Sequence, residues 1–460
     1  MKKFLLPFIL LFITSISFAD IVMQPYLQAV STNSIYVLVE ATTSDTVTVN
    51  YGLTISYGSI AKTESYLATD NSPVTYVHRI RLFNLQANTH YYYNAVHGSS
   101  TSSGSSFWTA VLSGTNYKFA WMADCRSGAS VHNVIAGYLL ATNPKFSIYG
   151  GDLCYSSTYA YWKSEFFTPN EIIAIKQIPF FGVVGNHEGW TPDTKAFEQN
   201  PMSPSGTQDY YSFEYGDVHF TVINFMIDYS VNSPQYNFVA GDLAATNKIW
   251  KVVISHNPAY CSGGHGEDPV MITWSQNLFV PNHVDMVISG HSHFYQHNFV
   301  NGIHHMVIGT AGAPFYVPTN ASYTIKSLQS YCYATVDVSP NTYYMKVFDN
   351  NNSWIDTVIL TKPSGVINNH EIVKEFKLNQ NHPNPFNPNT KISFDLPKSS
   401  FVKLQIFDID GKLVATLIND SLNPGKYEIQ FDGTNLASGV YLCKLETEGF
   451  SSVNKMILSK

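Results

Sequence analysis

Alternating apolar and polar positions mark four short segments in the first quarter of the chain. They lie at 34–40, 46–51, 74–82 and 90–96 and are rich in Val, Ile, Tyr and Thr. Alternation with a period of two is typical of a strand that buries one face. Strand signals separated by turn residues, with no helical period between them, predict a β-sandwich over residues 20–113.

The pattern changes between residues 116 and 362, where uninterrupted apolar runs end abruptly in Gly, Asp, Asn or His. These runs read KFAWMAD, KFSIYGGD, FFGVVGNH, WKVVISH and VDMVISGH. Such runs are typical of strands that are buried on both faces, and the helical spacing of apolar residues over 131–141 predicts a helix between the first two. The segment therefore predicts an α/β layered domain whose site lies at the carboxyl ends of its strands.

Alternating strands return towards the end of the chain. The segments KISFDL, FVKLQIFDI, LVATLI, KYEIQF and GVYLCKLET are separated by turns such as the one at Asp410 and Gly411. The prolines of HPNPFNP exclude a helix at the start of this region. We therefore expect a multidomain protein with a linker at 363–377 and a C-terminal Ig-like β-sandwich at 378–460.

The first residues predict a secretory signal peptide. Lys2 and Lys3 precede an apolar stretch that runs to Phe18 and ends in the small residue Ala19. Because the stretch is too short to span a bilayer, we expect cleavage after Ala19, which removes residues 1–19 and leaves no transmembrane span. An uncleaved membrane anchor is the alternative. The mature chain is expected outside the cytoplasm.

Composition narrows the classes of protein further. Hydrophobic residues make up 45% of the 460 residues, which excludes a disordered chain, and charged residues only 13%. A formal net charge of −7 argues against nucleic acid as a partner, because nucleic-acid binding needs a basic surface. Five cysteines are too few for a scaffold built on disulfides.

Histidines gather in one part of the chain, since eight of the sixteen lie between His256 and His305. Imidazole is the commonest metal ligand among neutral side chains. Partners for these histidines come from motifs that each follow an apolar run, and together the motifs supply Asp124, Arg126, Asp152, Tyr155, Asn186, His187, Glu188, His256, His291 and His293. Because each motif follows a predicted strand, we expect all of them to meet at one edge of the sheet.

This set of side chains suits a pair of metal ions. Two ions about 3.5–4 Å apart need a bridging carboxylate together with oxygen and imidazole ligands. Asp152 is the expected bridge, because its carboxylate offers two oxygens and offsets the repulsion between the ions. His291 and His293 are two residues apart and can reach different ions, and Asn186 offers a neutral carbonyl oxygen.

In this order the motifs resemble those of the calcineurin-like metallophosphoesterase superfamily, whose domain is a β-sandwich flanked by helices. Tyr155, three residues after Asp152, makes the chain similar to purple acid phosphatases. The segments QPYLQ and SFWTA resemble the edges of the fibronectin type III-like N-terminal domain of that family. The resemblance implies two metal ions. Fe(III) is assigned to Asp124, Asp152, Tyr155 and His293, and a divalent ion (Zn, Mn or Fe) to Asp152, Asn186, His256 and His291.

The resemblance also implies the reaction, which is hydrolysis of a phosphate monoester by metal-bound hydroxide. His265 lies nine residues after His256, where the family has a substrate-facing histidine, and would protonate the leaving group, with His187 assisting. The chain departs from the family at Gly266, where a second histidine is usual, and Glu267 could substitute for it. Arg126 stands where the family has Gly and either binds the substrate phosphate or balances charge. Asn186 is also expected to contact substrate.

The region 378–460 resembles the C-terminal sorting domain of proteins exported by type IX secretion. The resemblance rests on NHPNPFNPNTKISF, the DGK turn, LASGVY and the closing VNKMILSK. It implies that type IX secretion machinery is a partner and that the chain crosses the periplasm and outer membrane to be secreted or held at the cell surface. The source is then a bacterium of the Gram-negative type.

Two other functions use the same residues. The same metal centre would serve an extracellular phosphodiesterase or nucleotidase, because only the pocket shape separates these from a monoesterase. A non-catalytic surface-binding protein built on an inactive enzyme domain is a second alternative. Among the cysteines, Cys125, Cys154, Cys261 and Cys332 allow three pairings, and we expect a disulfide between loops near the site.

Overall fold

The computed structural model describes residues 20–189, 191–198, 207–362, 373–398, 400–422, 424–434 and 436–460. The expected signal peptide, 1–19, and the first ten residues of the expected linker, 363–372, lie outside the described residues. The chain divides into two compact units, a larger one that runs to Ile359 and a smaller one from Leu360 that also takes Pro340–Thr342. Among the described residues, no helix is long and apolar enough to cross a membrane.

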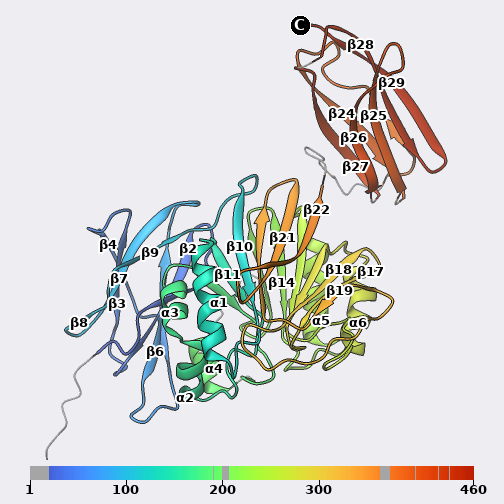
Figure 1. Cartoon of the computed structure of the whole chain (residues 1–460). Helices are drawn as coiled ribbons and strands as arrows, with labels where there is room; N and C mark the ends of the chain where they lie inside the picture. The colour runs from blue at the N-terminus through green and yellow to red at the C-terminus, as the bar shows by residue number, and fades with distance from the viewer. Residues whose placement is uncertain are drawn as a thin grey trace, which may run out of the picture. The chain divides into compact units, whose positions relative to one another are not determined.

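A ten-stranded sheet forms one layer of the larger unit (Figure 1). In spatial order its strands are β22 (Trp354–Thr361), β21 (Thr342–Asp349), β20 (Cys332–Val338), β10 (Tyr117–Met122), β11 (Phe146–Tyr149), β12 (Phe180–Gly182), β1 (Tyr26–Gln28), β2 (Ser34–Ala41), β6 (Tyr76–Phe83) and β5 (Ser65–Ala68). Strands β10, β11 and β12 are parallel to one another and almost wholly buried, which confirms the prediction from their apolar runs.

A seven-stranded sheet forms the second layer. Its strands, in spatial order, are β13 (Tyr211–Tyr215), β14 (Val218–Ile223), β15 (Trp250–Ser255), β16 (Met286–Ser289), β18 (Ile303–Ile308), β17 (Tyr295–Val300) and β19 (Thr324–Leu328). The two sheets face each other through aromatic rings, because Phe220 of β14 meets Phe119 of β10 at 5.4 Å and Phe146 of β11 at 5.8 Å between centroids. This aromatic layer fixes the spacing of the two sheets.

Helices cover the outer faces of both sheets. Beside the first sheet lie α1 (Ala129–Ala141), α2 (Tyr159–Tyr161), the π-helix η1 (Trp162–Phe166), α3 (Pro169–Ile175) and α4 (Pro192–Phe197), and beside the second lie α5 (Pro234–Ala245), α6 (Pro269–Trp274) and the π-helix η2 (Ser275–Phe279). Their apolar faces form separate hydrophobic clusters with the strands beneath. The result is a helix–sheet–sheet–helix arrangement, with α1 where the spacing at 131–141 predicted a helix.

The expected N-terminal segment is continuous with this architecture. Its strands β1, β2, β6 and β5 extend the ten-stranded sheet, because Gln28 of β1 pairs in parallel with Phe180 of β12. A separate sheet holds β4 (Ser59–Lys62), β3 (Thr48–Gly52), β7 (His90–His97), β8 (Ser100–Thr101) and β9 (Ser105–Trp108). Burial alternates strictly along β7, as the period of two predicted.

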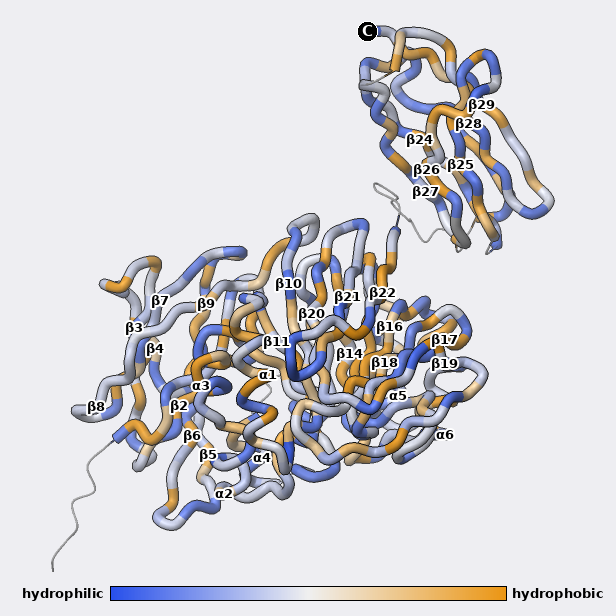
Figure 2. The backbone as a smooth tube through the Cα atoms, in the orientation of Figure 1, coloured by the Kyte–Doolittle hydropathy of each residue, from blue (hydrophilic) through white to orange (hydrophobic). Residues whose placement is uncertain are grey.

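The smaller unit consists of two antiparallel sheets around one hydrophobic core. One contains β23 (Lys377–Leu378), β24 (Asn389–Leu396) and β27 (Gly425–Asp432), and the other β26 (Leu413–Leu422), β25 (Ser400–Asp408), β28 (Gly439–Thr447) and β29 (Phe450–Leu458). Figure 2 shows the apolar and polar positions alternating along these strands, whereas the central strands of the larger unit are more continuously apolar.

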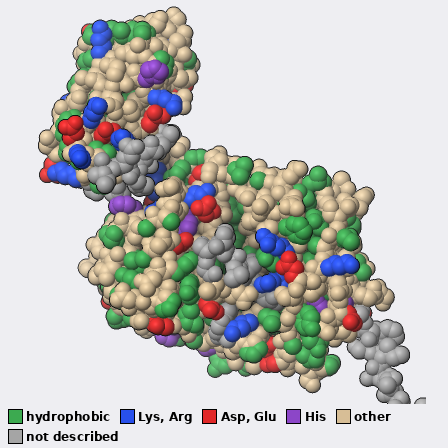
Figure 3. Space-filling view, turned by 180° about the vertical axis from the view of Figure 1, so that it is seen from behind, with side chains coloured by type: hydrophobic (Ala, Val, Ile, Leu, Met, Phe, Trp, Pro, Cys, Tyr) green, Lys and Arg blue, Asp and Glu red, His purple; other side chains and the backbone are tan. Residues whose placement is uncertain are grey.

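The surface reflects the low charge content of the chain. In Figure 3, hydroxyl-bearing, amide and backbone atoms dominate the face in view, and charged groups are scattered among them. Neutral polar groups are therefore more prominent on this face than ionised ones.

Beneath the first sheet, a buried acid in α3 lies in apolar surroundings. Glu171 is 0% exposed, accepts a hydrogen bond from the Tyr149 hydroxyl, and lies 3.4 Å from Nε2 of the equally buried His132. Burial raises the pKa of Glu171 to about 8 and lowers the pKa of His132 to about 4. Both side chains are therefore neutral near pH 7, where the unfolded chain would carry an ionised glutamate.

This pair predicts a specific dependence of stability on pH. Because the pKa of Glu171 is raised in the folded state, the folded chain holds one more proton than the unfolded chain, and stability falls as pH rises towards 8. His132 has the opposite effect, but only below about pH 6.5. Between pH 6.5 and 8 the wild type should lose up to about 1.4 kcal/mol of unfolding free energy per pH unit through this group, and Glu171→Gln should abolish that loss. Urea unfolding of the wild type and of Glu171→Gln at several pH values in this window measures the free energy of unfolding. If that free energy changed with pH equally in both proteins, the raised pKa of Glu171 would be contradicted.

Candidate metal centre

The predicted site residues lie where parallel strands end. Asp124 follows β10, Asp152 follows β11, His187 follows β12, His256 follows β15, and His291 with His293 follows β16. These strands belong to the two facing sheets, and their carboxyl ends bring the six side chains together. The expected convergence is therefore present in the structure, with contributions from both sheets.

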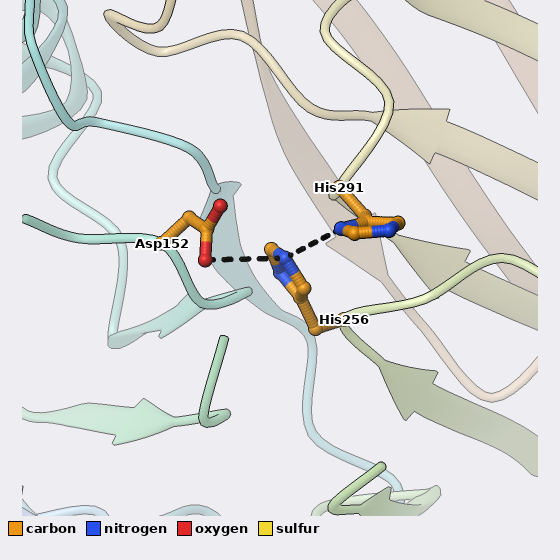
Figure 4. Close-up of side chains that lie close together, drawn as sticks. All are labelled: Asp152, His256 and His291. Atoms are coloured by element: carbon orange, nitrogen blue, oxygen red, sulfur yellow. Dashed lines mark hydrogen bonds and ion pairs between the residues drawn. The ribbon is translucent and has the colours of Figure 1, made fainter. Parts of the chain in front are cut away.

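Two groups of side chains are able to hold a metal ion. In each group the ligand atoms lie within 4.8 Å of one another: Asp152, His256 and His291 form one group, and Asp124, Asp152 and His293 form the other. Figure 4 shows the first group, in which the His256 ring lies between the Asp152 carboxylate and the His291 ring. Asp152 belongs to both groups, which is the position expected of a bridging ligand.

Local backbone geometry brings these side chains inward. Asp124, Asp152 and His291 have φ of 55°, 53° and 68°, values in the left-handed region that non-glycine residues rarely adopt. Neighbouring glycines leave room for them, because a Cβ on Gly290 would lie 2.4 Å from Oδ2 of Asp124. A Cβ on Gly185 would lie 2.2 Å from the Asp152 nitrogen. Strained backbone of this kind gathers at functional sites.

Hydrogen bonds fix which nitrogen of each imidazole faces the carboxylates. Nδ1 of His256 donates to the Gly150 carbonyl and Nδ1 of His293 donates to the Pro314 carbonyl, both at 2.7 Å. The Nε2 atoms are left facing Asp152 at 3.4 Å and Asp124 at 3.5 Å, respectively. Metal-ligating histidines typically donate their second nitrogen to a carbonyl in this way, so these residues fit a metal site.

The charges of the site are strongly coupled. Asp152 is 1% exposed, and although burial raises its pKa, the neighbouring His256 and His187 lower it well below the usual value. Burial lowers the pKa of His256, but Asp152 and Asp124 outweigh this and raise it to about 9. Burial and the charge of His256 together lower the pKa of His291 to about 2. A cation between these groups would satisfy the carboxylates without protonating a histidine.

Arg126 lies inside the site. Its Nε is 3.4 Å from Oδ2 of Asp152, and its Nη2 is 3.3 Å from Nε2 of His293. The residue is 7% exposed. Of the two roles left open by the sequence, charge balance is visible in these contacts, because the guanidinium offsets the Asp152 charge.

Two predicted ligands lie beside the two groups. The Tyr155 side chain is 50% exposed and its ring contacts those of Tyr161 and His187. Asn186 is exposed in the turn before His187. Among the described residues, neither side chain has a hydrogen bond or ion pair to Asp124, Asp152 or the histidines of the two groups.

The two predicted catalytic histidines border the site. His187 donates its backbone N–H to Oδ1 of Asp152 at 3.0 Å, and its Nε2 lies 3.9 Å from Oδ2 of the same residue. His265 is exposed and its ring stacks on that of His291 at 4.0 Å. Glu267 accepts a hydrogen bond from Tyr323.

Two further residues support the site. The sequence motifs name Glu188 but assign it no role at the metal centre: it is buried and accepts hydrogen bonds from the backbone N–H groups of Asp152 and Leu153, so it holds the loop of the shared carboxylate. Phe225 stacks on His256 at 5.5 Å and meets His291 edge-on at 5.8 Å, yet no motif marks it.

The expected disulfide is absent. All five cysteines are free thiols and all are buried, so the prediction of a bridge between loops near the site is wrong. Cys154 lies 3.3 Å from the Ser156 carbonyl and Cys332 lies 3.4 Å from the Thr310 hydroxyl, which satisfies each thiol locally. These cysteines fill the core as small apolar side chains.

Comparison with protein families identifies two regions. Residues 118–295 match the calcineurin-like phosphoesterase family, and residues 381–459 match the secretion system C-terminal sorting domain. The chain therefore contains a phosphoesterase domain and a sorting domain, as the sequence predicted.

Several curated relatives are plant proteins. The chain is 28% identical to the probable inactive purple acid phosphatase 9 of Arabidopsis thaliana over 35% of this chain and 33% of that protein. It is 25% identical to a purple acid phosphatase of Glycine max, covering 55% and 61% of the two chains, and 25% identical to the Fe(3+)-Zn(2+) purple acid phosphatase 12 of Arabidopsis thaliana, covering 53% and 58%. The chain thus spans between a third and about three fifths of these relatives.

Solved structures share the fold. Purple acid phosphatase PPD1 from yellow lupin (Lupinus luteus) seeds superposes with a TM-score of 0.63 at 18% identity, covering 73% of this chain and 74% of that chain. The structure of PhoD gives a TM-score of 0.54 at 11% identity, covering 74% and 88%. The resemblance to purple acid phosphatases is confirmed at the level of fold and sequence.

The shared carboxylate predicts unequal effects of substitution on metal content. Asp152→Asn should lower the amount of metal bound at both sites, because both groups use this carboxylate. His291→Ala should lower the amount bound at only one site, because His291 belongs to only one group. Mass spectrometry of metals in the purified proteins measures this. Asp45→Asn, at an exposed position of the N-terminal segment, is the control and should retain the wild-type content. Equal losses in Asp152→Asn and His291→Ala would contradict the sharing of Asp152.

Proposed function

We propose that this chain is a secreted, metal-dependent phosphatase that hydrolyses phosphate monoesters in the manner of purple acid phosphatases. The observation that carries the proposal is the buried Asp152 carboxylate shared by two groups of potential metal ligands. These groups lie in and around a segment that matches the calcineurin-like phosphoesterase family, and one relative is named as an Fe(3+)-Zn(2+) enzyme.

The proposed ligands divide between two ions. Fe(III) would be held by Asp124, Asp152, Tyr155 and His293, and a divalent ion (Zn, Mn or Fe) by Asp152, Asn186, His256 and His291. The two groups with converging ligand atoms support five of these seven residues. Tyr155 and Asn186 rest on their positions in the motifs, three residues after Asp152 and directly before His187.

When bound, such ions lower the pKa of a coordinated water and neutralise the charge of a phosphate. The residues of the chain orient the ester around them. Arg126 offers a guanidinium fork, which matches the oxygens of a phosphate, and Asn186 offers an exposed amide. His265 and His187 are the proposed proton donors to the leaving oxygen, since both border the ligand groups and neither belongs to them.

Export completes the proposal. The match over 381–459 supports type IX secretion machinery as the partner of the C-terminal region and a location outside the cell or at its surface. In this reading 1–19 is a signal peptide and 20–113 a fibronectin III-like domain. The catalytic domain spans 116–362, a linker 363–377 and an Ig-like sorting sandwich 378–460.

The choice of a monoester as substrate is tested by comparing esters. Rates with para-nitrophenyl phosphate and bis-para-nitrophenyl phosphate are measured at equal metal loading, and the monoester should be hydrolysed faster. A faster reaction with the bis-ester would assign the centre to a phosphodiesterase. Hydrolysis of neither ester by a protein holding two metal ions would overturn the proposed reaction.

The tyrosine ligand is tested by colour. A phenolate bound to Fe(III) gives a visible charge-transfer band, so the iron-loaded wild type should be coloured and Tyr155→Phe should lose or strongly shift the band. Tyr161→Phe is the matched control, because Tyr161 is also exposed and its ring lies 5.5 Å from that of Tyr155. An unchanged spectrum in Tyr155→Phe would remove the tyrosine from the ligand set.

A further inference from the structure

One aromatic side chain links a ligand histidine to the proposed proton donor. The Tyr316 ring stacks on the His293 ring, with centroids 4.3 Å apart and planes 10° apart. The same ring meets His265 edge-on at 5.0 Å and 88°. His265 in turn stacks on His291. Tyr316 therefore contacts both a member of one ligand group and the exposed histidine beside the other.

The segment around Tyr316 holds His293 in three ways. The Pro314 carbonyl accepts from Nδ1 of His293 at 2.7 Å, the Tyr316 N–H donates to the His293 carbonyl at 3.1 Å, and the Tyr316 ring covers the imidazole. The hydrogen bond through Nδ1 fixes the tautomer of the ring but leaves it free to tilt about that bond. A parallel ring against its face removes this freedom.

The loop that carries His265 is tied to the same segment. Ser262 and Thr319 are joined by a backbone hydrogen bond of 3.0 Å and by their hydroxyls at 2.6 Å. The side-chain amide of Gln296, which is 0% exposed, accepts from the Ser262 N–H and donates to the Ser262 and Thr319 carbonyls. The two loops therefore form one cross-linked structure, and Tyr316 faces the histidines from within it.

We propose that Tyr316 is a positioning residue that fixes the orientation of His293 and His265 relative to each other. Its ring acts by packing, so the phenyl ring of phenylalanine should serve equally well. This inference rests on the proposed function for the role of His265, whereas the part that concerns His293 rests only on metal binding.

Metal titration separates the two parts. Zn²⁺ alone is titrated into metal-free full-length protein and followed by calorimetry. Substituting a residue that supports a metal ligand typically lowers the affinity for the metal by about tenfold or more. We expect Tyr316→Leu to weaken one of two sites by about tenfold and to leave the other unchanged, because Tyr316 contacts His293 but not His256. Tyr316→Phe should bind as the wild type does.

The matched control is Val317→Ala, in the same segment but with a side chain that is 71% exposed. Wild-type affinity for Zn²⁺ in Tyr316→Leu would overturn the proposal, because the side chain would then have no role. Equal weakening in Tyr316→Leu and Tyr316→Phe would also overturn it, because the role would then belong to the hydroxyl and not to the ring. Weakening in Val317→Ala would also overturn it, because the effect would then belong to the loop as a whole.

The link to His265 is tested with the monoester at saturating metal. Tyr316→Leu should lower kcat with little change in KM, and Tyr316→Phe should restore kcat. A rise in KM with an unchanged kcat would contradict the positioning of His265. If the wild type hydrolyses no ester, the proposed function fails, yet the titration still decides the role of Tyr316 towards His293.

Discussion

The structure depends on a carboxylate that is removed from water and must be satisfied by its surroundings. Asp152 is 1% exposed, and an ionised group there is costly unless charges and donors surround it. Arg126, His256 and the backbone N–H of His187 meet it from three different loops. The loops after β10, β12 and β15 therefore all contact the same carboxylate. The same charge is what would bind and bridge two cations.

The N-terminal segment stabilises the loops that surround this point. Glu40 of β2 is fully buried and accepts from Thr75, Tyr159 and Lys163, with an ion pair of 2.7 Å to Lys163. Tyr159 and Lys163 belong to α2 and η1, which follow the motif containing Asp152. Because the ten-stranded sheet also runs through both regions, the N-terminal strands act as a structural part of the larger unit.

The convergence of the candidate ligands could be predicted from the sequence because its signals are local. Apolar runs that end in Asp, Asn or His identify buried strands and place the side chains that follow them, so the sequence could predict that Asp124, Asp152, His256, His291 and His293 converge, and the structure brings their potential ligand atoms together. The continuity of β1 with β12 depends on a single register pair and has no sequence signature. Phe225 and Tyr316 act through ring packing across loops, and the pairing of cysteines depends on distances. Such properties arise only when distant segments meet.

The most direct test of the account is an anomalous difference map from crystals of the full-length protein loaded with iron and zinc. We expect two peaks about 3.5–4 Å apart on either side of the Asp152 carboxylate, one near His293 and the other near His256 and His291. A single peak, or two peaks that do not share Asp152, would contradict it.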